Sequence, residues 1–111
     1  MSYSQSNPLV EITTTVGNNA DAEKIAKALV QQRLAGCVQI AGPILSIYRW
    51  QGEIHQDQEW RCTIKTTLAL KDQVILAVKE IHPYETPEIL CLPILYSHPD
   101  YERWLHEAVG P

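Results

Sequence analysis

The segment Ile81-His82-Pro83-Tyr84-Glu85-Thr86-Pro87-Glu88 marks the point at which a helical pattern stops and a strand pattern begins. Each proline fixes its own φ and disfavours helical torsions in the residue before it, so His82 and Thr86 are expected to be extended. The segment therefore predicts a stiff turn from a helix into a strand. It also gathers an imidazole, a phenol and two carboxylates, which makes it the first candidate for a binding site.

The residues on either side of this segment carry the two patterns that it separates. Glu88 to Leu95 predicts a short strand, and Pro93 within it indicates a sheet edge because proline cannot donate to a ladder. Leu68 to Ile81 predicts a helix, because its apolar residues recur at helical intervals: Leu70, Val74, Ala77, Val78 and Ile81.

The end of the chain predicts one further helix. Ser97 is the expected N-cap, with Asp100 three residues on, as in a capping sequence. An apolar stripe on this helix must pack against another part of the molecule, and it consists of Tyr101, Trp104, Leu105 and Ala108.

The first part of the chain predicts a strand and then a helix. Polar and apolar residues alternate from Leu9 to Val16, so one face of this strand is expected to be buried. Gly17-Asn18-Asn19 breaks the strand and offers an N-cap. Apolar residues then recur at helical spacing from Ala22, and the helix is expected to end near Ala35 with Gly36 as its C-cap.

The middle of the chain predicts a long hairpin. Its first strand runs from Cys37 to Trp50, with Gly42-Pro43 as an interior bend or bulge. Gln51-Gly52 is typical of a hairpin turn, and Ile54 to Thr67 forms the returning strand. One face of that strand is expected to carry Trp60, Cys62, Ile64 and Thr66.

The predicted order of strand, helix, two strands, helix, strand and an extra helix is that of an α+β, ferredoxin-like βαββαβ fold. We expect residues 1–8 to form a flexible tail and residues 9–111 to form one domain. Each hairpin arm has roughly 14 residues, against the five or six of a common strand. Because unprotected strand edges invite pairing with another chain, the hairpin favours an oligomer.

Composition narrows the classes of partner. The chain has 111 residues and a net charge of -4, and no cluster of basic residues. Nucleic acid and anionic membranes are therefore not expected as partners, since both bind a basic surface. Neither a signal peptide nor a membrane span is indicated, so a cytoplasmic location is expected. The thiols of Cys37, Cys62 and Cys91 lie in apolar runs without metal-ligand spacing and are expected to be buried.

Several motifs in one order resemble the CutA divalent-cation tolerance proteins, and the resemblance covers nearly the whole chain from Leu9 onward. Tyr101 and Trp104 of the last helix are part of it. Its longer motifs are Leu34-Ala35-Gly36-Cys37-Val38, Tyr48-Arg49-Trp50-Gln51-Gly52-Glu53-Ile54, Ile64-Lys65-Thr66 and His82-Pro83-Tyr84-Glu85-Thr86-Pro87-Glu88.

The resemblance implies a stable homotrimer built on strand pairing between subunits, with a fold related to the trimeric PII signalling proteins. It also implies a role in tolerance of divalent cations, with copper binding proposed for the family. No organic cofactor is expected. No nucleophile stands beside a base in a recognisable arrangement, so an enzyme is not expected either.

For the metal site, the hypothesis is that His82, Glu88 and Glu85 bind Cu(II) or another divalent ion in a cleft between subunits, since imidazole suits copper. The alternative is that His82 caps the preceding helix and both glutamates are solvated. Some bacterial relatives carry a cysteine near the end of the first strand that is a proposed copper ligand, whereas this chain has Thr13-Thr14-Thr15. A hydroxyl is a poor copper ligand, so this difference weakens tight copper binding.

A second function stays open, in which clefts between subunits bind an anionic metabolite, as in a PII-like sensor. The absence of a Gly-rich phosphate loop argues against nucleotides. Lys65 belongs to a motif shared with the CutA family and is a cleft candidate for that reason. Four aromatic residues either stack on a ligand or fill the core and subunit contacts: Tyr48, Trp50, Trp60 and Trp104. The full set of cleft candidates is Lys65, Tyr84, Thr14 and Trp50.

Overall fold

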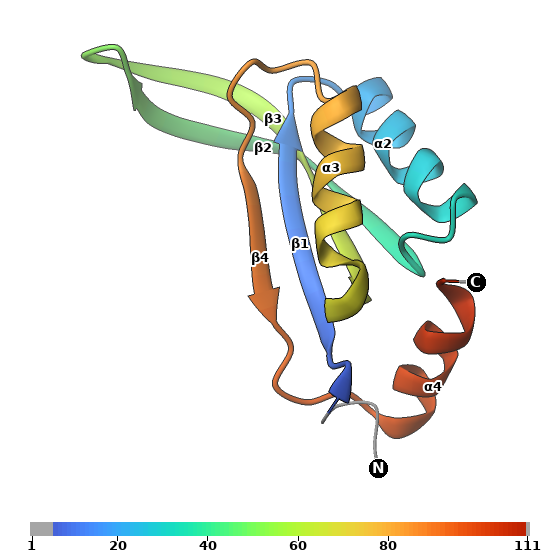
Figure 1. Ribbon diagram of the computed structural model, residues 1–111. Helices are drawn as coiled ribbons and strands as arrows, with labels where there is room; N and C mark the ends of the chain where they lie inside the picture. The colour runs from blue at the N-terminus through green and yellow to red at the C-terminus, as the bar shows by residue number, and fades with distance from the viewer. Residues whose placement is uncertain (1–5, 111) are drawn as a thin grey trace.

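Residues 6–110 are described by a computed structural model, shown in Figure 1. In chain order the elements are β1 (Leu9–Val16), α2 (Asn19–Gln31), β2 (Cys37–Trp50), β3 (Glu53–Thr67), the 3-10 turn η1 (Leu68–Leu70), α3 (Lys71–Ile81), β4 (Ile89–Pro93) and α4 (Pro99–Ala108). The predicted order of strands and helices is confirmed. The predicted second helix begins as a 3-10 turn, and the last strand is shorter than expected.

The four strands form one antiparallel sheet in the order β2-β3-β1-β4. This is the strand order of a ferredoxin-like fold, so the predicted fold class is confirmed. Pro93 pairs at the end of β4, an edge strand, where its missing N–H costs no ladder bond on the open side. Figure 1 shows β4 beside β1 at this edge, with the loop after α3 above it.

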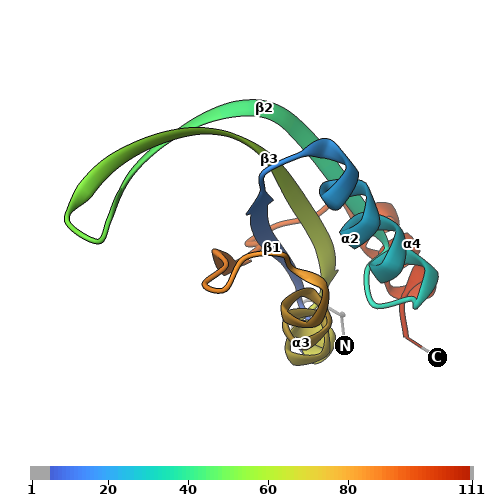
Figure 2. The same cartoon turned by 90° about the horizontal axis from the view of Figure 1, so that it is seen from above.

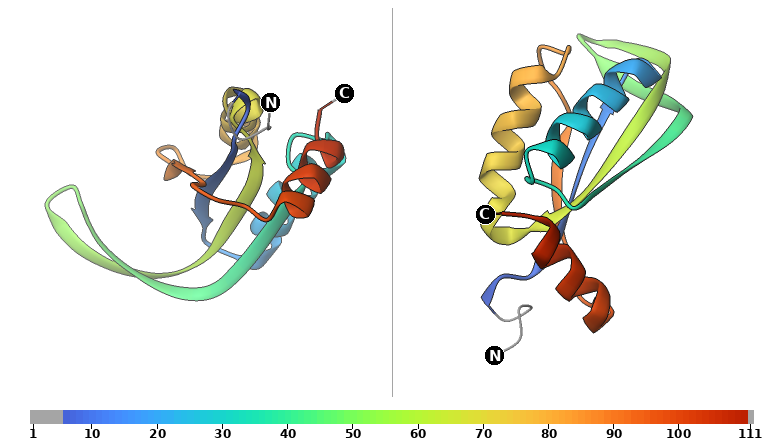
Figure 3. Two further views of the ribbon diagram at one scale, coloured as in Figure 1. Left: turned by 90° about the horizontal axis from the view of Figure 1, so that it is seen from below. Right: turned by 90° about the vertical axis from the view of Figure 1, so that its right-hand side faces the viewer.

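The helices α2 and α3 lie side by side over one face of the sheet, as the right-hand view of Figure 3 shows. The core between helices and sheet contains Ile12 and Val16 of β1, Ile25 and Leu29 of α2, Cys62 and Ile64 of β3, and Val74 and Val78 of α3. The predicted alternation along β1 is correct for its inner face. Its outer face is less exposed than expected, because Thr13 and Thr15 are also buried in this central strand.

The β2-β3 hairpin extends away from this body and curves, as Figures 1 and 2 show. A register shift between Ala41 and Ile44 confirms the predicted bulge at Gly42-Pro43. Gln51 and Gly52 both have positive φ, 50° and 82°, which is typical of a tight hairpin turn. Apolar side chains on the extended part are left exposed, above all Leu45, Ile47 and Ile54 at 64%, 60% and 67%.

The end of α2 differs from the prediction. The left-handed residue is Arg33 (φ 59°), and Gly36 already donates its N–H to the Lys65 carbonyl oxygen at the start of the hairpin. The Arg33 guanidinium donates to the carbonyl oxygens of Glu107 and Ala108, at 2.8 and 3.3 Å. These bonds give hydrogen-bond partners to two carbonyl oxygens at the end of α4. They also hold Arg33 in a backbone conformation that a non-glycine residue seldom adopts.

The start of α4 also differs from the prediction. Its N-cap is His98, whose Nδ1 accepts from the backbone N–H of Asp100 at 3.1 Å. Ser97 donates its hydroxyl to Glu102 at 2.8 Å instead. On the predicted apolar stripe Leu105 is buried, whereas the largest side chain, Trp104, is 47% exposed.

The thiols do not share one environment. Cys62 is buried, and burial raises the pKa of its thiol to about 11, so it is protonated at neutral pH. Cys37 is partly buried. The prediction of a buried thiol is wrong for Cys91, because this residue lies on the edge strand β4 and is exposed.

The last residues of the predicted tail are tied to the body. Pro8 accepts a hydrogen bond from the N–H of Leu68 at 2.8 Å, and the side chain of Asn7 accepts one from Ala69 at 2.8 Å. Residues 1–5 of that tail, and residue 111, lie outside the described residues. No helix within residues 6–110 has both the length and the apolar character that a membrane crossing requires.

Candidate functional site

His82 ends α3 and is 8% exposed, with an extended backbone (φ -70°, ψ 132°) that agrees with the restriction imposed by Pro83. Its Nε2–H donates to the Thr15 carbonyl oxygen at the end of β1, at 2.9 Å. Its Nδ1 accepts from the backbone N–H of Tyr84 at 3.1 Å. The ring therefore joins the loop to β1, and does not satisfy a carbonyl of its own helix.

This pair of hydrogen bonds defines a neutral imidazole with the proton on Nε2. Burial is the main cause that lowers the pKa of His82 below 6.5, and the Thr15 hydrogen bond, Asp21 and Glu59 oppose it. A metal ion could bond to this ring only at Nδ1, and only by displacing the Tyr84 N–H. Both ring nitrogens of His82 therefore already make hydrogen bonds, and these bonds hold the loop against β1.

Tyr84 connects the same loop to the hairpin. Its hydroxyl donates to Glu59 on β3 at 2.8 Å, and its ring lies tilted against that of His82, with the ring centres 4.9 Å apart. Burial and the Glu59 hydrogen bond both raise the pKa of the Tyr84 hydroxyl. Since Tyr84 stays protonated, it keeps donating to Glu59 at neutral pH.

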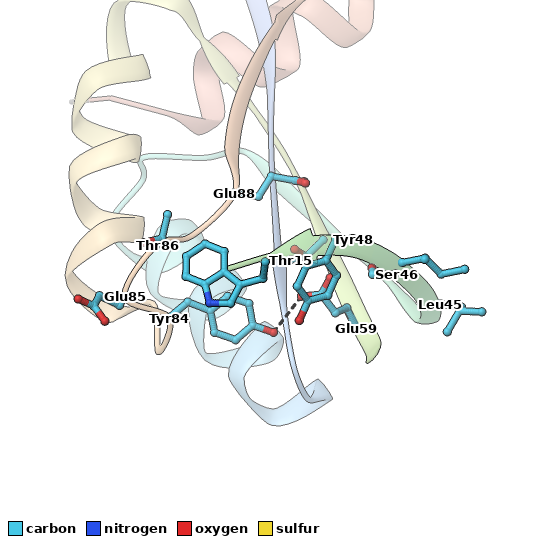
Figure 4. Close-up of a pocket in the computed structure, with 11 residues that line it drawn as sticks. Thr15, Leu45, Ser46, Tyr48, Glu59, Tyr84, Glu85, Thr86 and Glu88 are labelled. Carbon is cyan, nitrogen blue, oxygen red and sulfur yellow. Dashed lines mark hydrogen bonds between the residues drawn. The ribbon is translucent and has the colours of Figure 1, made fainter. Parts of the chain in front are cut away.

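A pocket of about 710 Å³ opens between this loop and the hairpin, and we call it the loop–hairpin pocket. Figure 4 shows the side chains that line it, with a dashed line for the hydrogen bond from the Tyr84 hydroxyl to Glu59. Its lining residues come from β1, β2, β3 and the loop: Thr15, Leu45, Ser46, Ile47, Tyr48, Trp50, Glu59, Tyr84, Glu85, Thr86 and Glu88.

Four of the residues predicted from the sequence meet in the loop–hairpin pocket: Glu85 and Glu88, proposed for metal, and Tyr84 and Trp50, proposed for a cleft. His82 lies behind the pocket and not in its lining. The assignment of these residues to a ligand stays a prediction, but their gathering in one place follows from the fold.

The other two cleft candidates lie elsewhere. Thr14 is fully buried on the core face of β1, and its hydroxyl has no hydrogen-bond partner among the described residues. Lys65 lies on the outer face of β3, where its ammonium group donates to the side chain of Gln39 at 3.3 Å. Neither residue lines the loop–hairpin pocket.

The sequence predicted Tyr48 only as a possible stacking or core residue. It did not predict the remaining lining residues as members of this site: Thr15, Leu45, Ser46, Ile47, Glu59 and Thr86. Glu59 is far from the loop in sequence, and its contact with Tyr84 depends on how the hairpin curves. The strong β-pattern of the hairpin predicts the strands but not this curvature. No local signal in the sequence could have brought Glu59 to Tyr84.

The possible metal ligands of the chain are mostly carboxylates, and they lie apart from one another. Within residues 6–110 no three side chains of His, Cys, Asp or Glu lie close enough together to hold a metal ion. Glu59, Glu85 and Glu88 share the pocket lining, and no basic side chain lines it. The described chain therefore offers a pocket lined by carboxylates and aromatic rings.

An antiparallel β2-β3-β1-β4 sheet covered by α2 and α3, with an extended hairpin, defines a ferredoxin-like α+β protein with a pocket between hairpin and loop. Residues 10–108 match the family described as CutA1 divalent ion tolerance protein. The chain belongs to this family.

Individual relatives agree with this assignment. The chain is 46% identical over 99 residues to the divalent-cation tolerance protein CutA of Thermus thermophilus, covering 89% of this chain and 96% of that protein. It is 40% identical to protein CutA of Mus musculus, covering 85% of this chain but only 53% of the mouse protein. The solved structure of CutA1 from Ehrlichia chaffeensis superposes with a TM-score of 0.91 at 28% identity, covering 95% of this chain and 98% of that chain.

Proposed function

We propose that the protein binds divalent cations, Cu(II) among them, through Glu85 and Glu88, and that it acts as a non-enzymatic homotrimer. The observation that carries this proposal is that these two carboxylates and Glu59 line the same pocket, which no basic side chain lines. Carboxylate oxygens are general ligands for divalent cations. Relatives named for divalent-cation tolerance support the same function.

The proposed trimer would supply what one chain lacks. A single subunit offers no group of three ligands within residues 6–110, so further ligands would come from a neighbouring copy. Exposed apolar residues on the hairpin, including Leu45, Ile47 and Ile54, support its burial against another subunit. The unusual stability and the cytoplasmic location expected from the sequence stay predictions.

His82 enters this proposal as a positioning residue. Coordination of a metal through its Nδ1 would break the hydrogen bond from the Tyr84 N–H. Glu85 and Glu88 line the pocket and could bind a metal without breaking that bond. A PII-like sensor of anionic metabolites is less well supported by this pocket, because its charged lining residues are all acidic.

We expect Cu(II) to bind one site per subunit in a calorimetric titration, after light scattering has established the oligomeric state. The double variant Glu85→Gln/Glu88→Gln is expected to weaken binding about tenfold or more, a loss of about 1.4 kcal/mol. His82→Ala is expected to weaken it less, because that ring is a positioning residue.

Glu107→Gln is the matched control, since this exposed carboxylate on α4 lies outside the pocket. Equal binding by the double variant and by the wild type would show that the copper is held elsewhere. A loss confined to His82→Ala would instead make the imidazole the principal ligand.

A further inference from the structure

Trp60 of β3 lies opposite the bulge in the β2-β3 hairpin. The register of the hairpin shifts between Ala41 and Ile44. Two residues of β2, Gly42 and Pro43, therefore lie opposite the single residue Trp60. An extra residue of this kind bends the strand that carries it and increases the local twist. The direction in which the curved hairpin of Figure 2 leaves the sheet is therefore decided beside Trp60.

The Trp60 ring occupies the space that a side chain at Gly42 would need. A Cβ at Gly42 would lie 2.4 Å from Cδ1, 2.6 Å from Cγ and 2.9 Å from Nε1 of Trp60. The glycines with positive φ among the described residues are Gly52 and Gly110, so the φ of Gly42 does not itself require glycine. Glycine is required at this position because the indole ring packs directly against the backbone of the bulge.

Trp60 also connects the bulge to the core and to the candidate site. It is partly buried and packs against the core, in which Val16 is its pairing partner on β1. The next residue along β3, Glu59, projects from the opposite face of the strand and accepts the hydrogen bond from the Tyr84 hydroxyl at 2.8 Å. Since neighbouring residues of a strand move together, the packing of Trp60 determines where the Glu59 carboxylate lies.

We propose that Trp60 is a positioning residue for the candidate site. Its ring, packed between the core and Gly42, sets the direction of the hairpin and so brings Glu59 to Tyr84. These contacts lie at the base of the hairpin and within one chain, so they do not depend on what covers its distal apolar residues. The inference rests on the proposed function only where metal binding is measured, because the hydrogen bond between Tyr84 and Glu59 needs no metal.

The test follows the Tyr84 hydroxyl in the full-length protein by nuclear magnetic resonance of carbon-13-labelled tyrosine as the pH is raised, with Tyr84→Phe to identify its signal. Burial and the Glu59 hydrogen bond raise the pKa of this hydroxyl. Gly42→Ala is expected to lower the pKa of Tyr84 toward its usual value of about 10, because the new Cβ displaces the ring or the strand and weakens the bond to Glu59. Trp60→Val is expected to lower it as well, because the bulge loses its support.

The double variant Gly42→Ala/Trp60→Val tests whether the two residues act through their contact. The smaller side chain at 60 vacates the space that the new Cβ needs, so the double variant should have a Tyr84 pKa closer to that of the wild type than Gly42→Ala alone has. Trp104→Val is the matched control, since it makes the same exchange on α4, outside the pocket, and is expected to leave the Tyr84 pKa unchanged.

A residue that only fills space would give a different result. If Gly42→Ala and Trp60→Val lower the free energy of unfolding but leave the Tyr84 pKa unchanged, the proposal is wrong, whatever happens to copper binding. Equal shifts of the Tyr84 pKa in Gly42→Ala and in the double variant would also overturn it, because the contact between the two residues would then have no part in the effect.

Copper titration separates this inference from the metal proposal. Trp60→Val is expected to weaken Cu(II) binding about tenfold, as the loss of a supporting residue around a metal site typically does, and Trp104→Val is expected to leave it unchanged. If the wild type binds no copper while Trp60→Val lowers the Tyr84 pKa, the metal proposal fails and the positioning role stands. If the wild type binds copper and Trp60→Val changes neither measurement, the positioning role fails alone.

Discussion

Leu105→Ala is expected to lower the free energy of unfolding by about 2–5 kcal/mol, because it removes a fully buried side chain and leaves a cavity. Leu105 is the only residue of α4, within Pro99–Ala108, that is fully buried, so this one side chain carries most of the apolar docking of the helix. Urea unfolding at a fixed subunit concentration measures the change, since association would make stability depend on concentration.

Gly36 provides the complementary test. A Cβ at this position would lie 2.4 Å from Leu105 Cδ1, 3.2 Å from its Cγ and 3.4 Å from Ala108 Cβ. Gly36→Ala is therefore expected to destabilise by about 1–3 kcal/mol through overpacking. In Leu105→Ala the space that the new Cβ needs is vacant. The double variant should therefore lose less free energy of unfolding than the sum of the losses of the two single variants.

Trp104→Ala is the control for this pair, because Trp104 lies on the same helix and is half exposed. Trp104→Ala should lower the free energy of unfolding by less than Leu105→Ala does. Strict additivity of Gly36→Ala and Leu105→Ala would show that the two positions do not touch, which contradicts the packing of α4 against the start of the hairpin.

His82→Ala is expected to lower the free energy of unfolding by about 1–3 kcal/mol, because the Thr15 carbonyl and the Tyr84 N–H each lose a buried partner. The loss should fall on the loop first, so the amide of Tyr84 should exchange its hydrogen faster. Chemical denaturation and hydrogen exchange together measure both effects. An unchanged Tyr84 exchange rate would show that His82 does not hold the loop.

The stability that His82 provides depends on pH with a definite sign. Its pKa is lowered in the folded protein, so below about 6.5 the unfolded chain takes up a proton that the folded chain does not. The contribution of His82 is thus fully present above pH 6.5 and is lost as the pH falls below it. The slope is at most about 1.4 kcal/mol per pH unit for one proton.

Denaturation curves between pH 5 and 7.5 are expected to show this slope in the wild type and its reduction in His82→Ala. His98→Asn is the matched control, because it removes an exposed imidazole while keeping a side chain that can cap α4. If His98→Asn abolished the slope and His82→Ala preserved it, the assignment to His82 would be wrong.

The sequence by itself determined the elements and their order, because local periodicity and breakers are short-range properties. Three features are present as predicted: the Gln51-Gly52 turn, the bulge at Gly42-Pro43 and the edge position of Pro93. The inner face of β1 is also buried as predicted, whereas its outer face is more buried than the alternation indicated. The restriction that Pro83 places on His82 also gave its extended backbone. These features depend on torsions and side-chain spacing within a few residues.

The ends of helices were less predictable, because a cap depends on what packs beside it. The first helix was expected to end near Ala35 with Gly36 as its cap, but α2 ends at Gln31. Arg33 takes the left-handed conformation, and its guanidinium is held by carbonyl oxygens more than seventy residues away, at 107 and 108. Ser97 was expected to cap α4, but its hydroxyl is bonded to Glu102 and His98 takes its place.

Only the tertiary structure decided the candidate site. The sequence predicted that Tyr84, Glu85 and Glu88 lie on one loop, but the curvature of the hairpin brings Glu59, Tyr48 and Trp50 to the same pocket. That curvature follows from the twist of long paired strands and the bulge within them. A tertiary contact also fixes the His82 ring, because its Nε2 donates to the carbonyl oxygen of Thr15 on β1, a partner that no local pattern encodes.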